Sequence, residues 1–242
     1  MYSGSTFYTS STILPDGQEE VEVVEPETTT TTSYVATTTI YTTTNTGASG
    51  QVTVLVVQPT PGMQYFGFED PADAGSAQQP NASRFNNDAA NINVQGVFPD
   101  NINFQTQEVT GLYQFPGQSA PTDASNYAVV FEGYFYGPEG TYSVTVSTAT
   151  DDYGFLWTNS SAYSDWTNNN AEVTESIGGD YTQNHTFTIA PGDFLPMTIL
   201  WVNVYQTGDL EFVIYPPGGG NITDTSGYFV QPFAGDNFVY HV

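Results

Sequence analysis

The stretch that decides the fold reads Gly133-Tyr134-Phe135-Tyr136-Gly137-Pro138-Glu139-Gly140-Thr141-Tyr142. It closes an aromatic-rich segment, Tyr127–Gly137, and opens the segment Thr141–Ala149, where apolar residues alternate with Ser and Thr. Alternation with a period of two is typical of a strand with one buried face. Gly and Pro between the segments favour a turn. We therefore predict two β-strands that form a hairpin.

Further strand-like segments follow this hairpin. They are Thr182–Ala190, Pro196–Tyr205 and Asp209–Tyr215, with Gly-containing turns between them and no helical periodicity of useful length. Closely spaced strands with such turns predict an all-β sandwich or barrel. Large aromatic and aliphatic side chains gain most from burial. The predicted core residues are Phe131, Phe135, Trp157, Leu200, Trp201 and Phe212.

The composition excludes several classes of function. One Lys or Arg against 26 Asp and Glu gives a net charge of -25, whereas nucleic acids and anionic lipids are bound by basic surfaces. With 38% hydrophobic residues, the chain is too apolar for a disordered acidic tail. No apolar run is long enough to cross a bilayer, and no signal peptide follows Met1.

Glycosylation sequons indicate a location outside the cell. They begin at Asn81, Asn159, Asn184 and Asn221. The chain has no Cys, which excludes disulfides, thiol chemistry and every Cys-based metal site. We therefore expect an extracellular protein. We also expect this chain to be a fragment of a longer precursor.

Residues 1–60 contain a sequence repeated with an offset of 33 positions, so that Thr6–Thr9 matches Thr39–Thr42. Each copy reads as a Thr-rich strand, a Gly turn and a Val-rich strand closed by Pro. Because one hairpin buries little surface, we expect the copies to dock on each other or on the main domain. The run Thr28–Thr32 indicates an O-glycosylated or extended stalk, and a disordered Thr-rich leader is the alternative. The predicted domains are residues 1–60 and 61–242.

The adjacent pair Asp151–Asp152, at the end of a predicted strand, is the main candidate for chemistry. Burying two carboxylates requires a counter-charge, and Arg84 is the only Lys or Arg in the chain. A bound cation is one solution, and hard oxygen ligands favour calcium or magnesium. A solvated turn is the alternative. His185 and His241 have no zinc-ligand spacing. Adjacent Asp residues suit a shared metal better than the flanking carboxylates of a glycosidase, so we expect no enzyme.

Several of these stretches resemble known families. The segment at residues 133–142 resembles a hairpin of the PA14 superfamily, and Asp151–Trp157 with Ala162–Trp166 resembles its fungal adhesin branch, the GLEYA domain. The name-giving motif has a counterpart at Gly62–Phe66, where Gln64 and Phe66 depart from the family pattern. This resemblance covers residues 62–230. The repeats in residues 1–60 resemble the Thr-rich repeats of flocculins. Together they imply a PA14/GLEYA-like, jelly-roll-like β-sandwich that follows two short β-hairpin repeats. They also imply a location at the cell wall or cell surface, with the targeting and anchoring segments outside this fragment.

The resemblance implies a calcium-dependent lectin in which the two Asp residues, joined by a cis peptide, bind Ca2+. A second loop would add the Asn203 amide and the backbone carbonyls of Tyr205 and Thr207. At the end of an apolar strand, a buried Asn203 would need a partner; an ordinary turn Asn is the alternative. The implied ligands are cell-surface glycans with vicinal hydroxyls. Their implied contacts are Asp151, Asp152, Tyr153, Asn203, Val204, Tyr205 and Gln206. The alternative function is a structural or homophilic protein-binding cell-wall module that calcium only stabilises.

Overall fold

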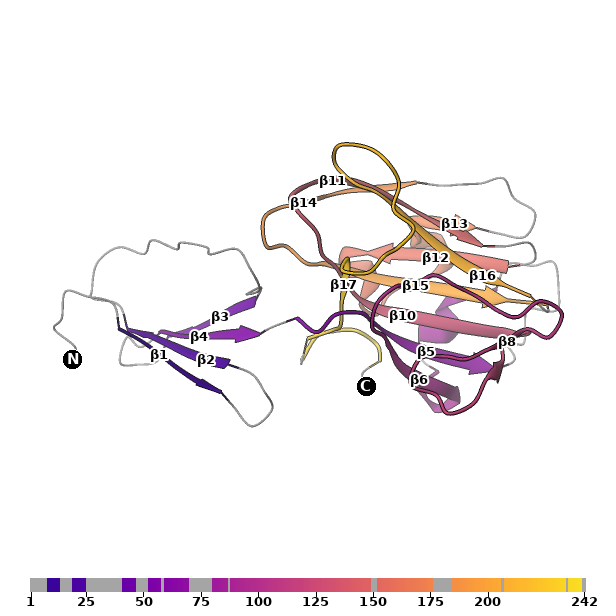
Figure 1. The fold of residues 1–242 in the computed structure, drawn as a ribbon, viewed down its shortest axis with the longest axis horizontal. Coiled ribbons are helices and arrows are strands. Elements are labelled where there is room, and N and C mark those ends of the chain that lie inside the picture. The colour runs from indigo at the N-terminus through magenta and orange to yellow at the C-terminus, as the bar shows by residue number, and fades with distance from the viewer. Residues whose placement is uncertain are drawn as a thin grey trace. The chain divides into compact units, whose positions relative to one another are not determined.

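The computed structural model describes residues 8–13, 19–24, 41–46, 52–57, 59–69, 80–86, 88–148, 152–175, 184–205, 207–233 and 235–240. The chain divides into two compact units, Met1–Thr60 and Pro61–Val242. Figure 1 shows both as β-structure. The threonine run at Thr28–Thr32 lies outside the described residues.

The first unit is one antiparallel sheet of two hairpins. Its strands are β1 (Tyr8–Ile13), β2 (Glu19–Val24), β3 (Tyr41–Thr46) and β4 (Val52–Val57). β1 pairs with β2 and β3 pairs with β4, as the repeat predicts, and the strand order is β1-β2-β4-β3. The two copies therefore meet along their Val-rich strands β2 and β4.

The second unit is a sandwich of two antiparallel sheets. The larger sheet has the order β13-β12-β15-β10-β5-β6, with β17 also paired to β10, and the smaller sheet has the order β14-β11-β16-β7. β8 and β9 form a separate two-stranded ribbon. The bounds are β5 (Met63–Glu69), β6 (Ile92–Phe98), β7 (Phe104–Gln105), β8 (Leu112–Tyr113), β9 (Thr122–Asp123), β10 (Tyr127–Phe135), β11 (Gly140–Thr148), β12 (Asp152–Thr158), β13 (Val173–Glu175), β14 (His185–Ile189), β15 (Leu195–Asn203), β16 (Asp209–Tyr215) and β17 (Phe229–Val230).

The predicted hairpin between residues 127 and 149 is wrong, although both of its strands exist. β10 lies in the larger sheet between β5 and β15, whereas β11 lies in the smaller sheet between β14 and β16. β10 pairs with β15 along one edge and with β5 and β17 along the other, so β11 has no place beside it. The Gly-Pro turn instead carries the chain from one sheet to the other. Tyr142 donates a hydrogen bond to the Pro138 carbonyl (2.9 Å), which fixes this crossing.

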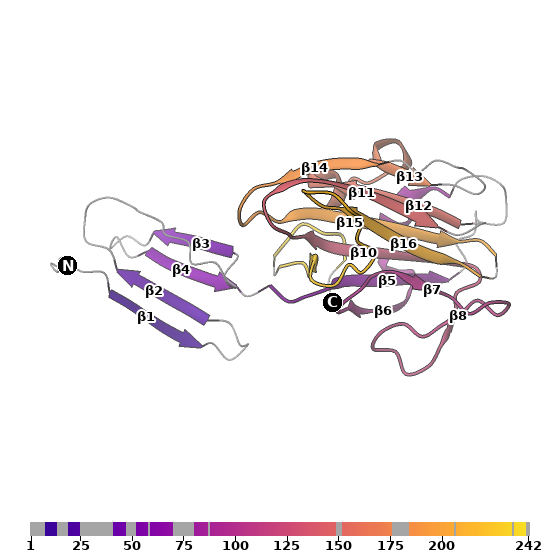
Figure 2. The same cartoon turned by 45° about the horizontal axis from the view of Figure 1, so that its top comes forward.

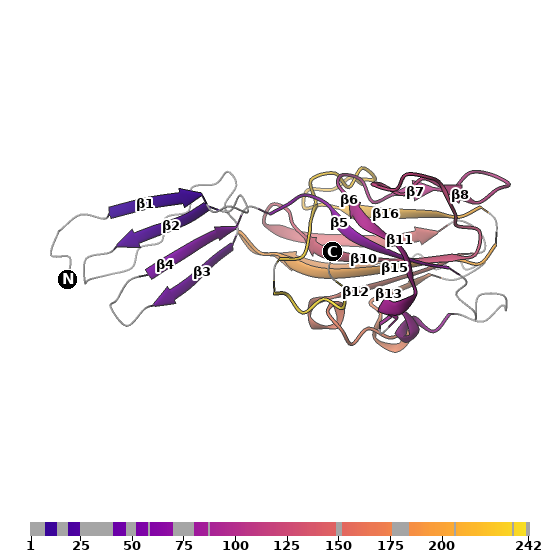
Figure 3. The same ribbon diagram turned by 90° about the horizontal axis from the view of Figure 1, so that it is seen from below.

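Two aromatic-rich clusters fill the spaces on either side of the larger sheet. The inner cluster, between the two sheets, includes Phe131, Phe135, Trp201 and Phe212. The outer cluster includes Trp157, Trp166, Leu200 and Tyr240. Every predicted core residue is fully buried, which confirms the core. Figures 2 and 3 show β16 over one face of the larger sheet and short helices on the other.

The helical elements of the described chain are the short 3-10 helices η1 (Ala82–Asn86), η2 (Ala89–Asn91), η3 (Asn159–Ala162) and η4 (Asn168–Asn170). None of the helices described is long and apolar enough to span a membrane. The predicted all-β class is therefore confirmed.

Candidate carbohydrate-binding site

The predicted ligands from two separate segments meet at one end of the sandwich. Asp152 is the first residue of β12 and Asn203 is the last residue of β15, and the two are directly opposite in the antiparallel register. Tyr127, at the start of β10, is opposite Asn203 on the other side of β15. Directly opposed residues on neighbouring strands have Cβ atoms only about 4.5–5.5 Å apart. Asp152 and Asn203 are therefore close neighbours although 51 positions separate them in sequence.

Asn203 is fully buried, and its amide is held in one orientation. Its Nδ2 donates to the Ala124 carbonyl (2.8 Å), and its Oδ1 accepts from the Tyr205 backbone N–H (2.9 Å). The donor side of the amide therefore faces the segment before β10, whereas the oxygen faces the loop that follows β15. A carbonyl oxygen has two lone pairs, so accepting one N–H is compatible with ligating a cation.

The segment that receives Asn203 is itself ordered by a local turn. The Asp123 carboxylate accepts hydrogen bonds from the hydroxyl (2.6 Å) and the backbone N–H (3.1 Å) of Ser125. These bonds hold the pKa of Asp123 below its ordinary value. The Ala124 carbonyl lies between these two residues, so the turn positions the acceptor that orients Asn203.

The loop between β15 and β16, residues 204–208, is anchored to a second loop at residues 106–111. Thr106 and Gly208 exchange two hydrogen bonds, each 2.9 Å long. The Val109 backbone N–H donates to the Thr207 hydroxyl (3.3 Å). These bonds fix the backbone at Thr207 and Gly208, where one of the predicted carbonyl ligands lies.

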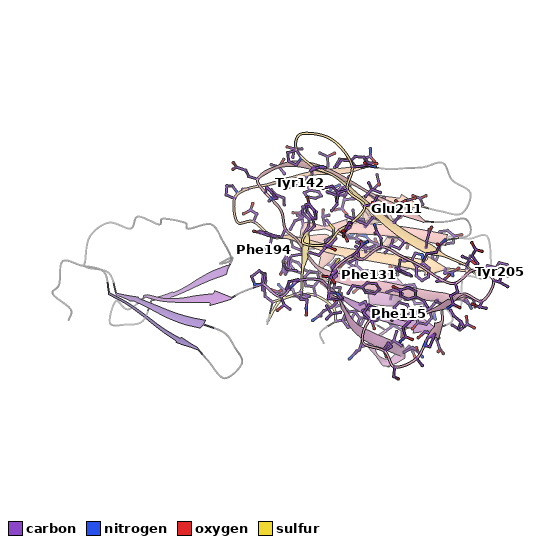
Figure 4. All side chains as sticks on the ribbon, in the orientation of Figure 1. Phe115, Phe131, Tyr142, Phe194, Tyr205 and Glu211 are labelled. Carbon is purple, nitrogen blue, oxygen red and sulfur yellow. The ribbon has the colours of Figure 1, made fainter. Side chains whose placement is uncertain are left out.

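Two exposed apolar side chains lie on these loops. Tyr205 is 61% exposed and Val109 is 79% exposed, and Figure 4 shows Tyr205 projecting from an end of the sandwich. Val109 has a φ of 74°, in the left-handed region that costs a β-branched residue of the order of 1–2 kcal/mol. Strained backbone of this kind concentrates at functional sites. Sequence reasoning missed Val109, because a valine gives no signal for such a conformation.

The other predicted contacts have different outcomes. Tyr153 is only 2% exposed and lies in the outer cluster, so its ring is not available to stack on a sugar. The alternation of β12 puts it on the same face as Phe155 and Trp157 of that cluster. Val204 is half-buried against the same cluster. Asp151, its bond to Asp152, and Gln206 lie outside the described residues, and Asp152 is described by its backbone alone.

The donor set that the structure brings together fits a hard cation. Asn203 has an amide oxygen that faces the loop after β15, and the neighbouring strand begins with Asp152. Calcium takes such oxygen ligands in irregular loop geometry, whereas zinc prefers His and Cys. Within the described residues, no group of three or more His, Asp or Glu forms a separate metal cluster. Arg84 lies in η1, with its guanidinium carbon 5.7 Å from the centroid of the Phe85 ring.

Comparison with known proteins gives a family match over part of the chain. The GLEYA domain model matches residues 127–216, which run from the start of β10 to just after β16 and contain both Asp152 and Asn203. Among curated protein sequences, none matches this chain.

Solved structures share the fold. One is the A domain of Epithelial Adhesin 6 from Candida glabrata in complex with Galβ1-3GlcNAc (18% identity, TM-score 0.55, 73% of this chain and 89% of that chain). Another is the A domain of Epithelial Adhesin 9 from the same yeast, also in complex with Galβ1-3GlcNAc (14% identity, TM-score 0.58, 73% and 92%). The sandwich of this chain is therefore similar to the fold of these adhesin domains.

Proposed function

We propose that residues 61–242 form a calcium-dependent carbohydrate-binding domain of a fungal cell-surface adhesin, which mediates adhesion to cells or surfaces through glycans. The observation that carries this proposal is the direct pairing of Asp152 with Asn203, whose amide oxygen is turned towards the loop at residues 204–208. The GLEYA match over the same strands supports it, as do the disaccharides bound to the similar adhesin domains.

In this proposal Asp151, Asp152, Asn203 and the carbonyls of Tyr205 and Thr207 would hold the ion. When bound, calcium would supply open coordination positions for two neighbouring hydroxyls of a sugar. The Asp carboxylates would accept charge-assisted hydrogen bonds from the same hydroxyls. The exposed ring of Tyr205 would cover an apolar sugar face, and residues 204–207 would influence the choice of sugar. Val109 would also influence the choice of sugar, because it is exposed and its N–H donates a hydrogen bond to Thr207.

A glycan array probed with the full chain tests the proposal. We expect binding in millimolar calcium that is lost in chelator. Asp152→Asn keeps the size of the side chain and removes its charge, and charge-assisted hydrogen bonds contribute about 1.5–3 kcal/mol. We therefore expect binding to weaken at least about tenfold. Asp100→Asn is the matched control. Asp100 is exposed and follows β6, at the end of the sheet away from Asp152 and Asn203.

Two results would contradict the lectin proposal. Glycan binding that persists unchanged in chelator, or in Asp152→Asn, would place the site elsewhere. Calcium that raises the melting temperature of the parent chain without any glycan retained would favour the alternative, a structural or homophilic cell-wall module. A ligand present at a hundred times its dissociation constant adds about 2.7 kcal/mol of stability, so this effect is measurable.

A further inference from the structure

The two hairpins of the first unit are related by an internal two-fold relation. β3 begins 33 positions after β1 and β4 begins 33 positions after β2, which is the offset of the sequence repeat. β2 and β4 are antiparallel, and Val21 is directly opposite Val54. These two valines are equivalent positions of the repeat, because they too are 33 residues apart. The pairing therefore joins the same edge of both hairpins, with Val21 and Val54 at its centre.

An interface that joins the same surface of two equivalent units is self-complementary. Nothing in such a register requires that the two hairpins belong to one chain. If β2 of one molecule pairs with β4 of a second, and β4 of the first pairs with β2 of the second, every backbone pair of the sheet is kept. We propose that the first unit exchanges hairpins between two copies of this chain and so forms a homotypic contact.

The charges along β2 favour this exchange over the pairing of two copies of hairpin 1. In the observed register Glu20 is opposite Leu55 and Glu22 is opposite Thr53. If β2 paired with β2 of a second copy about Val21, each Glu20 would be opposite a Glu22. Like charges directly opposite each other destabilise a sheet. Hairpin 1 therefore prefers hairpin 2, whether in its own chain or in another.

Local concentration decides which chain supplies the partner. Because β2 and β4 belong to one chain, the partner within the chain is available at an effective concentration that we take to be in the millimolar range. Exchange therefore becomes appreciable where copies are themselves crowded to about that density. Dilute protein should be monomeric through this unit, and concentrated protein should contain exchanged dimers.

The chain contains no Cys, so single cysteines report the pairing directly. The Val21→Cys chain is mixed with an isotope-labelled Val54→Cys chain. The mixture is incubated at about 1 μM, far below the effective concentration of the partner hairpin within the chain, or at about 1 mM, close to it. It is then oxidised. Only pairing between chains can join residue 21 to residue 54 here. We expect the mixed covalent dimer to rise at least tenfold with concentration, and to exceed the Val21→Cys homodimer.

Three controls make the outcome decisive. Asp100→Cys measures random collision of exposed thiols. The double variant Val21→Cys/Val54→Cys in one chain should form an internal disulfide at 1 μM. Adding Glu20→Thr and Glu22→Leu, the residues of the second repeat, to Val21→Cys should raise its homodimer to the level of the mixed dimer. Sedimentation of the parent chain over the same range detects dimers independently of any cysteine variant.

A mixed dimer no more abundant than the collision control, together with a parent chain that stays monomeric at 1 mM, would overturn the proposal. An absent internal disulfide in the double variant would overturn the register itself. The proposal does not depend on carbohydrate binding, so neither result bears on the lectin site.

Discussion

Asn203 shows why one residue at a strand end decides the shape of the candidate site. Its donor is used by the Ala124 carbonyl and its oxygen accepts from Tyr205, so the amide both locks the loop and presents an oxygen to it. The burial of Asn203 follows from its place at the end of an apolar strand, and its proposed role follows from the family resemblance. Val109 had no such signal, because its exposure and positive φ depend on the loop that it contacts.

Asn203→Asp tests the oriented amide. The substitution replaces the Nδ2 donor with an oxygen that faces the Ala124 carbonyl, and two buried acceptors without a proton between them are unfavourable. We expect the free energy of unfolding in chelator to fall by about 1–3 kcal/mol, as measured by urea denaturation. If the residue also ligates calcium, added calcium should recover part of this loss. Asn221→Asp, at an exposed position beyond the far end of β16, is the control. Equal stabilities for Asn203→Asp and the parent would show that the amide orientation is unimportant.

At the scale of elements, strand positions could be predicted better than their partners. Asp209–Tyr215 matches β16 at both ends, the segment at 127–137 contains β10, and the segment at 196–205 contains all of β15 except Leu195. The sequence indicates the turn at Gly137–Gly140, but a Gly-Pro turn can join strands of one sheet or of two. What decides is that both edges of β10 are already paired, with β5 and with β15, which are remote in sequence. The sequence pattern also gives no indication that Glu132, in the middle of β10, is buried.

Glu132 makes the stability of β10 dependent on pH. It is fully buried, its Oε2 accepts from the Tyr240 N–H (3.1 Å), and neither its Oε1 nor the Oε1 of the directly opposed Gln64 has a hydrogen-bond partner. Burial raises the pKa of Glu132 from 4.5 to about 8, although the N–H groups of Tyr240 and Val239 oppose this. A folded-state pKa above the unfolded one means that the folded protein binds the proton more tightly. The stability that protonation of Glu132 contributes to the folded state is therefore fully present below pH 4.5 and is lost as the pH rises to about 8.

Glu132→Gln should remove this part of the pH dependence. A glutamine keeps the shape, adds a donor for the Gln64 oxygen and does not ionise. We expect the parent to lose stability between pH 5 and 8 relative to Glu132→Gln, as measured by chemical denaturation at each pH. Glu139→Gln, at an exposed position, should follow the parent. A Glu132→Gln profile parallel to the parent profile would mean that Glu132 does not hold its proton in the folded state.

At the scale of the whole molecule, the charge was the clearest property of the sequence, and it has a physical consequence for the fold. With 26 acidic residues and one Lys or Arg, compaction brings like charges together without compensating partners. Net charge of this size opposes the compact state through self-repulsion. The all-β class could be read from the same sequence, because turn residues and alternation are local. The assignment of strands to two sheets could not, because it depends on contacts between distant segments.

Raising the ionic strength should therefore stabilise the folded chain even without calcium. The Debye length falls from about 30 Å at 0.01 M salt to about 8 Å at 0.15 M, so repulsion between carboxylates spread over the surface is screened. In chelator, we expect the melting temperature to rise by several degrees between these two concentrations of sodium chloride. Tetramethylammonium chloride should act equally well, because screening does not depend on the identity of the cation.

Calcium should raise the melting temperature of the parent already at millimolar concentration. Asp152→Asn should lose that increase while keeping the response to sodium chloride. A melting temperature that is insensitive to salt in chelator would mean that the charges are spaced too widely to matter. A calcium response retained in Asp152→Asn would mean that calcium acts by general screening and not through the pair formed by Asp152 and Asn203.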